Sequence, residues 1–417
     1  MGKSLATRRL GARLLFVAVL LAALCVFVAA CGASSSSSSS ESTSASEGSG
    51  SSESAAATEG GGEEEGGEEE SGSSEEGGLV YFMAPNTQPE RYIHQDGPDF
   101  VKAMKELDPN IEVKQEVADG TSATQQSQIE TAIANGAKAL VVVAADPPSS
   151  AGLLEFAAAD EVPVIGYENV PLNGPLTSQV IFSPLSAGEQ QAKYFSEQVK
   201  EGKLGPTPVP IVRLYGNKGD VYEVQMKKGQ DKYMNPLIKE GAVEVTCENY
   251  VKEWAPENAQ TDMESCLSKN ADIRGYLGMY DGDVAGALAA LKQHGLDGQK
   301  VKMFGGQNPE LSGLQNLLLE EQQDEVYKPY PVEAKAAAEL ALAAVKGEEP
   351  PASLINAQVN NGADTIPTYE IPTIYGHLEE GVDPAALVQK AVDYGMFTWE
   401  EVCTGEAAQT KGCKENG

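Results

Sequence analysis

Polar and aromatic side chains gather in this sequence at the points where apolar runs end. The run at residues 79–84 is followed by Arg91 and Tyr92, and the run at 162–167 by Glu168 and Asn169. The same arrangement recurs at Trp254, Asp281, Gln307, Asn308 and Lys328. Carboxylates, amides, a guanidinium and an ammonium together suit a neutral, hydroxyl-rich ligand, because each hydroxyl both donates and accepts and charged planar groups can hold two hydroxyls at once. Aromatic faces would pack against the C–H faces of a ring-shaped ligand.

The acidic pair Asp281 and Asp283 in "MYDGD" could have several roles. The two carboxylates could bind a metal, act as acid and base, cap a helix or contact a ligand. No further oxygen ligands follow at the spacing of a calcium loop, which disfavours a metal. We predict that Asp281 ends a strand and contacts the ligand, whereas Asp283 is the N-cap of a helix at 284–294. Gly282 would let the chain turn between them.

Signatures of catalysis are missing from the sequence. We find no phosphate loop, no dinucleotide-binding glycine motif, no nucleophile elbow and no zinc-protease motif. His94, His294 and His377 are scattered and share no metal-ligand spacing. We therefore predict a protein that is not an enzyme, with no catalytic residues, no cofactor and no metal site.

Alternating strands and helices must position these side chains. Continuous apolar runs such as 79–84 and 209–215 are typical of strands buried on both faces. Helical patterns lie between the runs, for example at 97–107 and 256–269, the second with Pro in its first turn. This alternation predicts an α/β protein, and two such series in succession predict two doubly wound parallel-sheet lobes. The carboxyl ends of the strands would then line a cleft.

The N-terminus has the pattern of an export signal. Basic residues up to Arg13 precede an apolar stretch at 14–30, and "VAAC" places Cys31 where a bacterial lipoprotein carries its lipid. We predict a signal peptide at 1–30 and lipidation of Cys31, hence anchoring at the outer face of the cell membrane. A single transmembrane anchor is the alternative, although the stretch is near the short end for one. Both Sec and twin-Arg export stay open.

A segment rich in Ser, Gly and Glu follows at 32–78. It has no aromatic residue and no Lys or Arg, so it cannot bury enough apolar surface to offset the entropy of ordering. We predict a disordered tether that holds a folded domain away from the membrane. The chain carries a formal net charge of −32, and its folded part is also strongly acidic. This charge argues against nucleic-acid binding.

Four cysteines remain in the folded part of the chain. An even number outside the cytoplasm indicates disulfides. We favour Cys247–Cys266 and Cys403–Cys413, although the sequence permits three connectivities. A zinc site is the rival explanation, but the spacings are not those of zinc sites and no histidine lies near.

Several longer segments carry a family resemblance. They are "GTSATQQSQIETAIANGAKALVVVAADP", "VPVIGYEN", "YVKEWAPENAQTDMESCLSKN", "YDGDVAGALAALKQHGLDGQ", "GGQNPELSGLQ" and "VYKPYPVEAKAAAELA". In this order they resemble the type I periplasmic sugar-binding proteins of ABC importers, and most closely the D-xylose-binding proteins. The combination of "WAPENA" and "VYKP" is the most specific part of the likeness.

The resemblance implies two α/β lobes of the periplasmic-binding-protein type that close over a sugar by hinge motion. Three crossovers would join them, near 183–187, 326–330 and 366–369. The first lobe would comprise 79–184 and 329–367. The second would comprise 185–328 and 368–398, with 399–417 left as a C-terminal tail that has no counterpart in the family.

The resemblance also implies roles for individual residues. By position, the ligand-binding residues are Arg91, Tyr92, Glu168, Asn169, Trp254, Asp281, Gln307, Asn308 and Lys328. Three positions depart from the family pattern. Where the family has an Asp-Arg pair, this sequence has Glu168-Asn169. The family Asn before Asp281 is replaced by Tyr280, and a family Asn after a strand is replaced by Val221 or Tyr222. These departures keep the sugar class but change the hydroxyl pattern that the cleft can recognise.

Together these features predict the monomeric solute-binding lipoprotein of a sugar ABC import system. It would capture a monosaccharide, with a pentose such as xylose favoured, and deliver it to the permease subunits. A receptor that presents its ligand to a membrane sensor is an alternative in the same fold. An extracellular carbohydrate-active enzyme is an alternative of another class, and it would need a carboxylate pair, for which Glu168 and Asp281 are the candidates.

Overall fold

The computed structural model describes residues 77–87 and 89–417. The predicted signal peptide, the lipidated Cys31 and nearly all of the predicted tether lie outside these residues. Within the described ranges, no helix combines the length and the apolar character that a membrane crossing requires.

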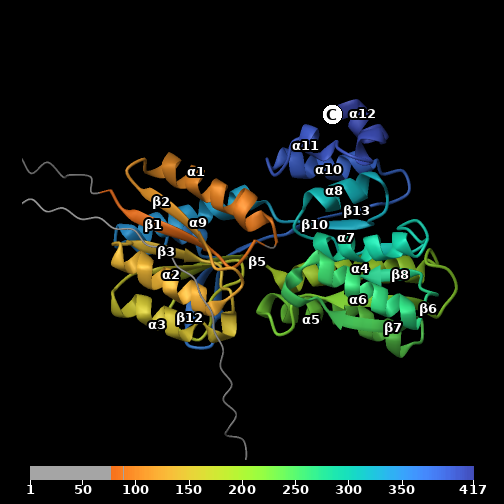
Figure 1. Cartoon of the computed structure of the whole chain (residues 1–417), viewed down its shortest axis with the longest axis horizontal. Coiled ribbons are helices and arrows are strands. Elements are labelled where there is room, and N and C mark those ends of the chain that lie inside the picture. The colour runs from red at the N-terminus through yellow and green to blue at the C-terminus, as the bar shows by residue number, and fades with distance from the viewer. Residues whose placement is uncertain (1–76, 88) are drawn as a thin grey trace, which may run out of the picture. The chain divides into compact units, whose positions relative to one another are not determined.

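The first lobe is built on a sheet whose strands run in the order β11-β12-β5-β4-β3-β1-β2. All neighbours are parallel except β11, which pairs antiparallel with β12. The strands are β1 (Leu79–Ala84), β2 (Glu112–Val117), β3 (Ala139–Val142), β4 (Val164–Tyr167), β5 (Ser178–Phe182), β11 (Ala357–Asn360) and β12 (Thr365–Ile371). Helices cover both faces, as Figure 1 shows on its left side.

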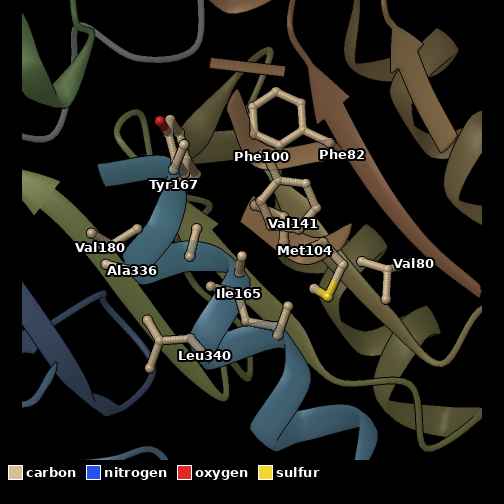
Figure 2. Close-up of a cluster of buried hydrophobic side chains, with 14 of the residues drawn as sticks. Val80, Phe82, Phe100, Met104, Val141, Ile165, Tyr167, Val180, Ala336 and Leu340 are labelled. Atoms are coloured by element: carbon tan, nitrogen blue, oxygen red, sulfur yellow. The ribbon is translucent and has the colours of Figure 1, made fainter. Parts of the chain in front are cut away.

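Strand β1 explains how the two faces of this sheet are buried. Alternate side chains point to opposite faces of a strand, so Val80 and Phe82 join one core cluster while Tyr81 and Met83 join the other. Helices α1 (Gly97–Leu107) and α9 (Tyr330–Val345) cover the Phe82 face, and α2 (Ser122–Ala134) and α3 (Ala151–Ala159) cover the opposite face. The ring centroid of Phe82 lies 5.4 Å from that of Phe100 and 5.3 Å from that of Tyr167, and Figure 2 shows the three side chains in this cluster. Each fully buried side chain of this size contributes roughly 1.5–3 kcal/mol.

The second lobe contains a smaller parallel sheet in the order β7-β6-β8-β9. Its strands are β6 (Val209–Tyr215), β7 (Val243–Tyr250), β8 (Gly275–Leu277) and β9 (Lys302–Phe304). Helices α4 (Pro184–Lys200) and α5 (Val221–Lys239) cover one face, and α6 (Pro256–Lys269) and α7 (Asp281–Gln293) cover the other. The fold-class prediction of two α/β lobes is confirmed.

The C-terminal part of the chain packs onto the second lobe as a small helical layer. Strand β10 (Asp324–Tyr327) pairs antiparallel with β13 (Ile374–His377), and α8 (Leu311–Leu318), α10 (Pro384–Asp393), α11 (Trp399–Val402) and α12 (Lys411–Asn416) share one apolar cluster with them. The disulfide Cys403–Cys413 lies in this layer, and Cys247–Cys266 joins β7 to α6. The structure therefore has the pairing that we favoured from the sequence.

Three connections run between the lobes. The first lies between β5 and α4, at residue 183, and the second between β10 and α9, at residues 328–329. The third lies at 372–373, between β12 and β13. The predicted third crossing at 366–369 is wrong, because these residues belong to β12, where Tyr369 still pairs with Val180 of the first sheet. The expected boundary between 367 and 368 therefore moves to 372–373.

Candidate ligand-binding site

A cavity of about 290 Å³ lies where the carboxyl ends of the two sheets face each other. Its size is close to the lower end of small-molecule pockets, roughly 300 Å³. The lining residues come from both lobes and from the second connection between them. They are Pro85, Asn86, Pro89, Tyr92, Gly120, Ala144, Ala145, Asp146, Glu168, Asn169, Asn217, Asp220, Tyr222, Lys252, Glu253, Trp254, Gln307, Asn308 and Lys328.

Most of the predicted site residues meet in this lining. Those that do are Tyr92, Glu168, Asn169, Trp254, Gln307, Asn308 and Lys328. Each follows the end of a strand: β1, β4, β7, β9 or β10. Arg91 and Asp281 are the two predicted residues that do not line the cavity. The structure brings the set together because parallel strands of each lobe present their carboxyl ends at one edge.

Glu168 and Lys328 form a buried ion pair in the cavity wall. Lys328 Nζ donates to Glu168 Oε1, and the same oxygen accepts from Arg91 Nη1 at 3.2 Å. Burial alone would raise the pKa of Glu168, but Lys328 and Arg91 outweigh it and hold that pKa below its usual value. Burial lowers the pKa of Lys328 to about 8, although the Glu168 carboxylate counters part of this effect. At neutral pH the site therefore holds an ionised carboxylate beside an ammonium.

Tyr222 completes the wall around this ion pair. The Nζ atom of Lys328 lies 3.9 Å from the centroid of the Tyr222 ring, a cation–π distance. The Tyr222 hydroxyl donates to Gln307 Oε1 at 3.4 Å. Tyr222 was noted in the sequence only as one possible replacement of a family asparagine. Its place at the start of α5, directly after a strand-end loop, is the signal that could have assigned it.

Trp254 stands on a helical turn, η3 (Lys252–Trp254), that follows β7. Its indole N–H donates to Asp220 Oδ2 at 3.2 Å, and the Tyr280 hydroxyl donates to its carbonyl oxygen. The Tyr280 ring meets the indole edge-on, with centroids 5.7 Å apart. A Cβ at Gly216 would lie 1.9 Å from Trp254 Cη2, so only glycine allows the indole its position. Trp254 is thus held on several sides with its ring in the cavity wall.

Several lining residues have a left-handed backbone. The φ angles are 52° at Glu168, 59° at Glu253, 55° at Trp254 and 57° at Asn308. Such conformations are disfavoured for residues with a Cβ and persist only where the surroundings enforce them. Strain of this kind concentrates at functional sites, which supports this cavity as the ligand site.

Asp281 lies behind the cavity wall instead of in it. Helix α7 begins at Asp281 itself, with Tyr280 as N-cap, three residues before the predicted start. The Asp281 carboxylate is fully buried and accepts from the amide of Glu310 at 2.9 Å and from Gln322 Nε2 at 2.8 Å. Burial raises its pKa to about 7. We therefore do not propose Asp281 as a ligand contact.

Asp283 does not have the predicted N-cap role. It lies inside the first turn of α7 and is fully buried, and burial raises its pKa well above the usual range. The prediction is wrong because the chain leaves β8 at Leu277 and enters the helix directly after Tyr280. Both acids therefore face the interior of the second lobe.

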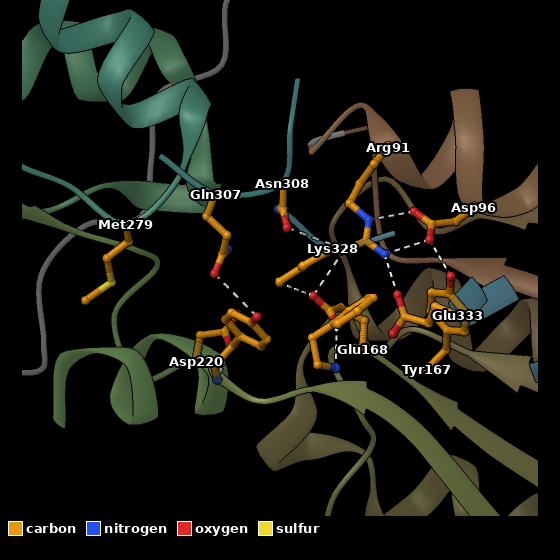
Figure 3. Close-up of polar contacts among 12 residues, drawn as sticks. Arg91, Asp96, Tyr167, Glu168, Asp220, Met279, Gln307, Asn308, Lys328 and Glu333 are labelled. Carbon is orange, nitrogen blue, oxygen red and sulfur yellow. Dashed lines mark hydrogen bonds and ion pairs between the residues drawn. The ribbon is translucent and has the colours of Figure 1, made fainter. Parts of the chain in front are cut away.

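Arg91 is also buried, with 3% of its surface exposed. Its guanidinium contacts Asp96, Glu168, Glu333 and Asn308, and it lies 4.1 Å from the Tyr330 ring centroid. Figure 3 shows it on the far side of Glu168 from Gln307. The position of Arg91 in the sequence does not indicate that the surrounding carboxylates hold its side chain away from the cavity.

Some lining residues were not assigned from the sequence. They are Asn86, Asp146, Asn217, Asp220, Lys252 and Glu253, which lie in the segments that follow β1, β3, β6 and β7. The available signal was their place after apolar strands, the same one that identified Glu168. Lys252 and Glu253 form an exposed ion pair of 2.9 Å at the rim.

The carboxylate pair considered from the sequence, Glu168 and Asp281, does not suit hydrolysis of a glycosidic bond. That chemistry needs two carboxyl groups flanking the bond, one of them with a raised pKa. Glu168 has a lowered pKa and Asp281 is absent from the lining. In the part of the chain that the structure describes, no group of acidic, His or Cys side chains is arranged to hold a metal.

Comparisons with known proteins place the chain in a family. A model of the periplasmic binding protein domain matches residues 80–349. The D-xylose-binding periplasmic protein of Escherichia coli (strain K12) is 29% identical over 66% of this chain and 79% of its own length. Its namesake from Haemophilus influenzae is 28% identical over 74% of this chain and 87% of its own length. A multiple sugar-binding periplasmic receptor, ChvE from Rhizobium radiobacter, is 26% identical over 70% of this chain and 84% of its own length.

Solved structures share the fold. A solute-binding protein from Clostridium phytofermentans, with bound β-D-glucose, superimposes with a TM-score of 0.67 at 22% identity, covering 78% of this chain and 99% of that one. A carbohydrate transporter solute-binding protein from Chloroflexus aurantiacus superimposes with a TM-score of 0.66 at 20% identity, covering 78% of this chain and 97% of that one. These relatives and neighbours are binding proteins and not enzymes. The family match spans well over half of the chain, and the chain therefore belongs to the periplasmic binding protein domain family.

Proposed function

We propose that this protein is the solute-binding component of a sugar ABC import system and that it captures a monosaccharide between its lobes. The observation that carries the proposal is the composition of the cavity wall. The aromatic residues Tyr92, Tyr222 and Trp254 line the same cavity as the ion pair of Glu168 and Lys328. Aromatic faces suit the C–H faces of a sugar ring, and the paired charges suit its hydroxyls.

The charge balance of the cavity supports an uncharged ligand. Each lining cation already faces a carboxylate, Lys328 facing Glu168 and Lys252 facing Glu253. A sugar acid or sugar phosphate would bring a further negative charge without finding a free cation among the described lining residues. A pentose such as D-xylose is favoured by the names of two relatives. The changed positions Glu168, Asn169 and Tyr280 leave the identity of the sugar to experiment.

Membership of the periplasmic binding protein family supports delivery of the bound sugar to permease subunits. The two lobes would close over the sugar by hinge motion at 183, 328–329 and 372–373, and a monomer suffices for this. The closed form, stabilised by contacts from both lobes, would be the state that the permease recognises. One relative is named a receptor, so presentation of the bound sugar to a membrane sensor is a second candidate role for the same closed form.

The predicted signal peptide and Cys31 extend the proposal to the membrane. A lipid on Cys31 would anchor the protein at the outer face of the cell membrane, and the Glu-rich segment would let the binding domain reach a permease. Metabolic labelling with a palmitate analogue tests this. We expect label on the wild-type chain and none on Cys31→Ala, whereas equal label on both would contradict lipidation.

Calorimetric titration tests the binding role directly. Residues 77–417 would be titrated with pentoses, hexoses, matched sugar acids and small non-sugar ligands. We expect one neutral monosaccharide to bind with roughly micromolar affinity, about −8 kcal/mol, and to be recovered unchanged. Absence of binding across all the sugars would overturn the proposal.

A further inference from the structure

All hydrogen-bonding capacity of Arg91 is used inside the protein. A guanidinium has five N–H donors. Nε donates to Asp96 Oδ2 at 2.7 Å, and Nη2 donates to Asp96 Oδ1 and to Glu333 Oε2, both at 2.6 Å. Nη1 donates to Glu168 Oε1 at 3.2 Å and to Asn308 Oδ1 at 3.4 Å. No N–H of Arg91 is left for a ligand.

The two acceptors on Nη1 belong to opposite lobes. Glu168 follows β4 of the first lobe, and Asn308 follows β9 of the second. Both line the cavity, and both have a left-handed backbone that needs support from its surroundings. Arg91 therefore links two cavity-lining residues across the lobes from behind the wall, as the dashed lines in Figure 3 show.

The position of Arg91 is fixed from the first lobe. Asp96 and Glu333 are fully buried and clamp the guanidinium from η1 (Tyr92–Asp96) and from α9. The Tyr167 hydroxyl donates to Asp96, and the Tyr330 ring covers the guanidinium face. Only the bond to Asn308 reaches the second lobe. Opening of the cleft would break that bond and leave the clamp intact.

We infer that Arg91 is a positioning residue that ties Glu168 of the first lobe to Asn308 of the second, and so favours the closed cleft without touching the ligand. The inference rests on the proposed hinge closure, but it does not depend on which sugar binds. It assigns Asp96 and Glu333 the task of holding the guanidinium. It also replaces the direct ligand contact that the family resemblance implies for Arg91.

The test measures lobe closure with and without ligand. Spin labels on exposed Lys105 of α1 and exposed Lys269 of α6, introduced through cysteines in the chain with its disulfides intact, report the distance between the lobes by pulsed electron paramagnetic resonance. Arg91→Lys keeps the positive charge but loses the planar, forked set of N–H donors. We expect it to lower the ratio of closed to open molecules about tenfold, which is the effect of losing one charge-assisted hydrogen bond. D-xylose should dissociate faster by a similar factor, while the ranking of sugars stays unchanged.

Two further variants keep the test decisive. Glu333→Gln keeps the side-chain shape and loosens the clamp, so it should shift closure in the same direction by a smaller factor. Arg274→Lys is the matched control, because Arg274 donates to the carbonyls of Leu204, Pro206 and Pro208 within the second lobe alone. It should leave closure unchanged even where it lowers the melting temperature.

Several outcomes would overturn the inference. One is an unchanged closed fraction in Arg91→Lys with only a lower melting temperature, which would mark a purely structural role. Another is a changed ranking of sugars with unchanged closure, which would mark a direct contact. If Arg91→Lys opens the ligand-free protein but no sugar closes the wild type, the inference stands and the proposed sugar-binding function fails.

Discussion

The indole N–H of Trp254 donates to Oδ2 of Asp220, while Oδ1 of the same carboxylate accepts from the amide of Tyr222 at 2.8 Å and caps helix α5. One acid therefore fixes two aromatic residues of the cavity wall. Asp220→Ala should lower the free energy of unfolding by about 1 kcal/mol, as expected for a lost N-cap. It should also weaken sugar binding about tenfold, because the indole loses its anchor.

Asp383→Ala is the control for this prediction. Asp383 caps α10 in the same way, through the amide of Ala385 at 3.0 Å, but does not line the cavity. It should reduce stability and leave affinity unchanged. Calorimetry and thermal melts of both variants separate the two effects. Equal loss of affinity in both would show that Asp220 acts only through global stability.

The space beside Gly216 predicts a second loss of binding. A methyl group there would overlap the Trp254 ring at 1.9 Å, so Gly216→Ala must displace the indole. We expect sugar affinity to fall at least about tenfold, since the stacking surface moves. Gly152→Ala, where a Cβ meets nothing within 4 Å, should bind normally. Normal binding by Gly216→Ala would mean that Trp254 does not contact the sugar.

The lowered pKa of Lys328 predicts weaker binding at alkaline pH. Above about pH 8 the folded protein loses the Lys328 proton and with it a charged donor in the cavity wall. Affinity for the sugar should be steady near neutral pH and fall as pH rises through about 8. Lys328→Met should bind more weakly and lack this decline. An unchanged decline in that variant would assign it to another group.

Deprotonation of Lys328 at alkaline pH should raise the free energy of unfolding, although it lowers the affinity for the sugar. The unfolded chain keeps the lysine proton up to its ordinary pKa of about 10.5, whereas the folded protein releases it near 8. The contribution of Lys328 to the free energy of unfolding therefore increases between these values. Denaturant titrations of wild type and Lys328→Met across this window isolate it. Loss of affinity without loss of stability would exclude unfolding as its cause.

Buried acids of the second lobe predict lower stability as pH rises from acid to neutral. Burial raises the pKa of Asp281 and of Asp324 from 3.8 to about 7. Between these values the folded state holds protons that the unfolded chain has released, so the free energy of unfolding falls as pH rises toward 7.

Asp281→Asn tests this prediction because it removes the titrating group and keeps the shape. The variant should be more stable than wild type at about pH 8 and similar to it at about pH 4. Asp272→Asn, at an exposed loop position, should follow the wild-type curve. A wild-type curve that rises steadily from pH 4 to 7 would contradict the prediction.

The two disulfides should differ in what they protect. Each closes a short loop, with sequence separations of 19 for Cys247–Cys266 and 10 for Cys403–Cys413, and such bridges contribute about 3 kcal/mol. Removing Cys403–Cys413 by a double serine variant should raise hydrogen exchange in α11 and α12 and leave sugar binding intact. Removing Cys247–Cys266 should lower the global melting temperature, because it joins strand β7 of the second-lobe sheet to α6. Equal exchange patterns in the two variants would contradict this division.

Local pattern was sufficient for several elements of the fold. Helix α6 begins and ends where Pro256 and the apolar spacing predict, and β6 matches its apolar run. These segments are determined by periodicity over neighbouring residues, which the sequence contains in full. The short sequence separations favoured the two disulfides that the structure has, although the sequence permitted three connectivities. The third crossing was misplaced because β12 continues in the first sheet by pairing with β5, a contact across many residues.

The direction of individual side chains needed the tertiary structure. The sequence by itself determined that polar groups end the strands, and therefore that residues such as Glu168 and Lys328 meet at the edge of the sheets. It could not determine that Arg91 turns away from the cavity, because Glu333 lies 242 positions along the chain. Nor could it determine that Asp281 faces Gln322, since the turn after β8 sets that direction. Which charges pair depends on long-range contacts in three dimensions, and only the fold decides them.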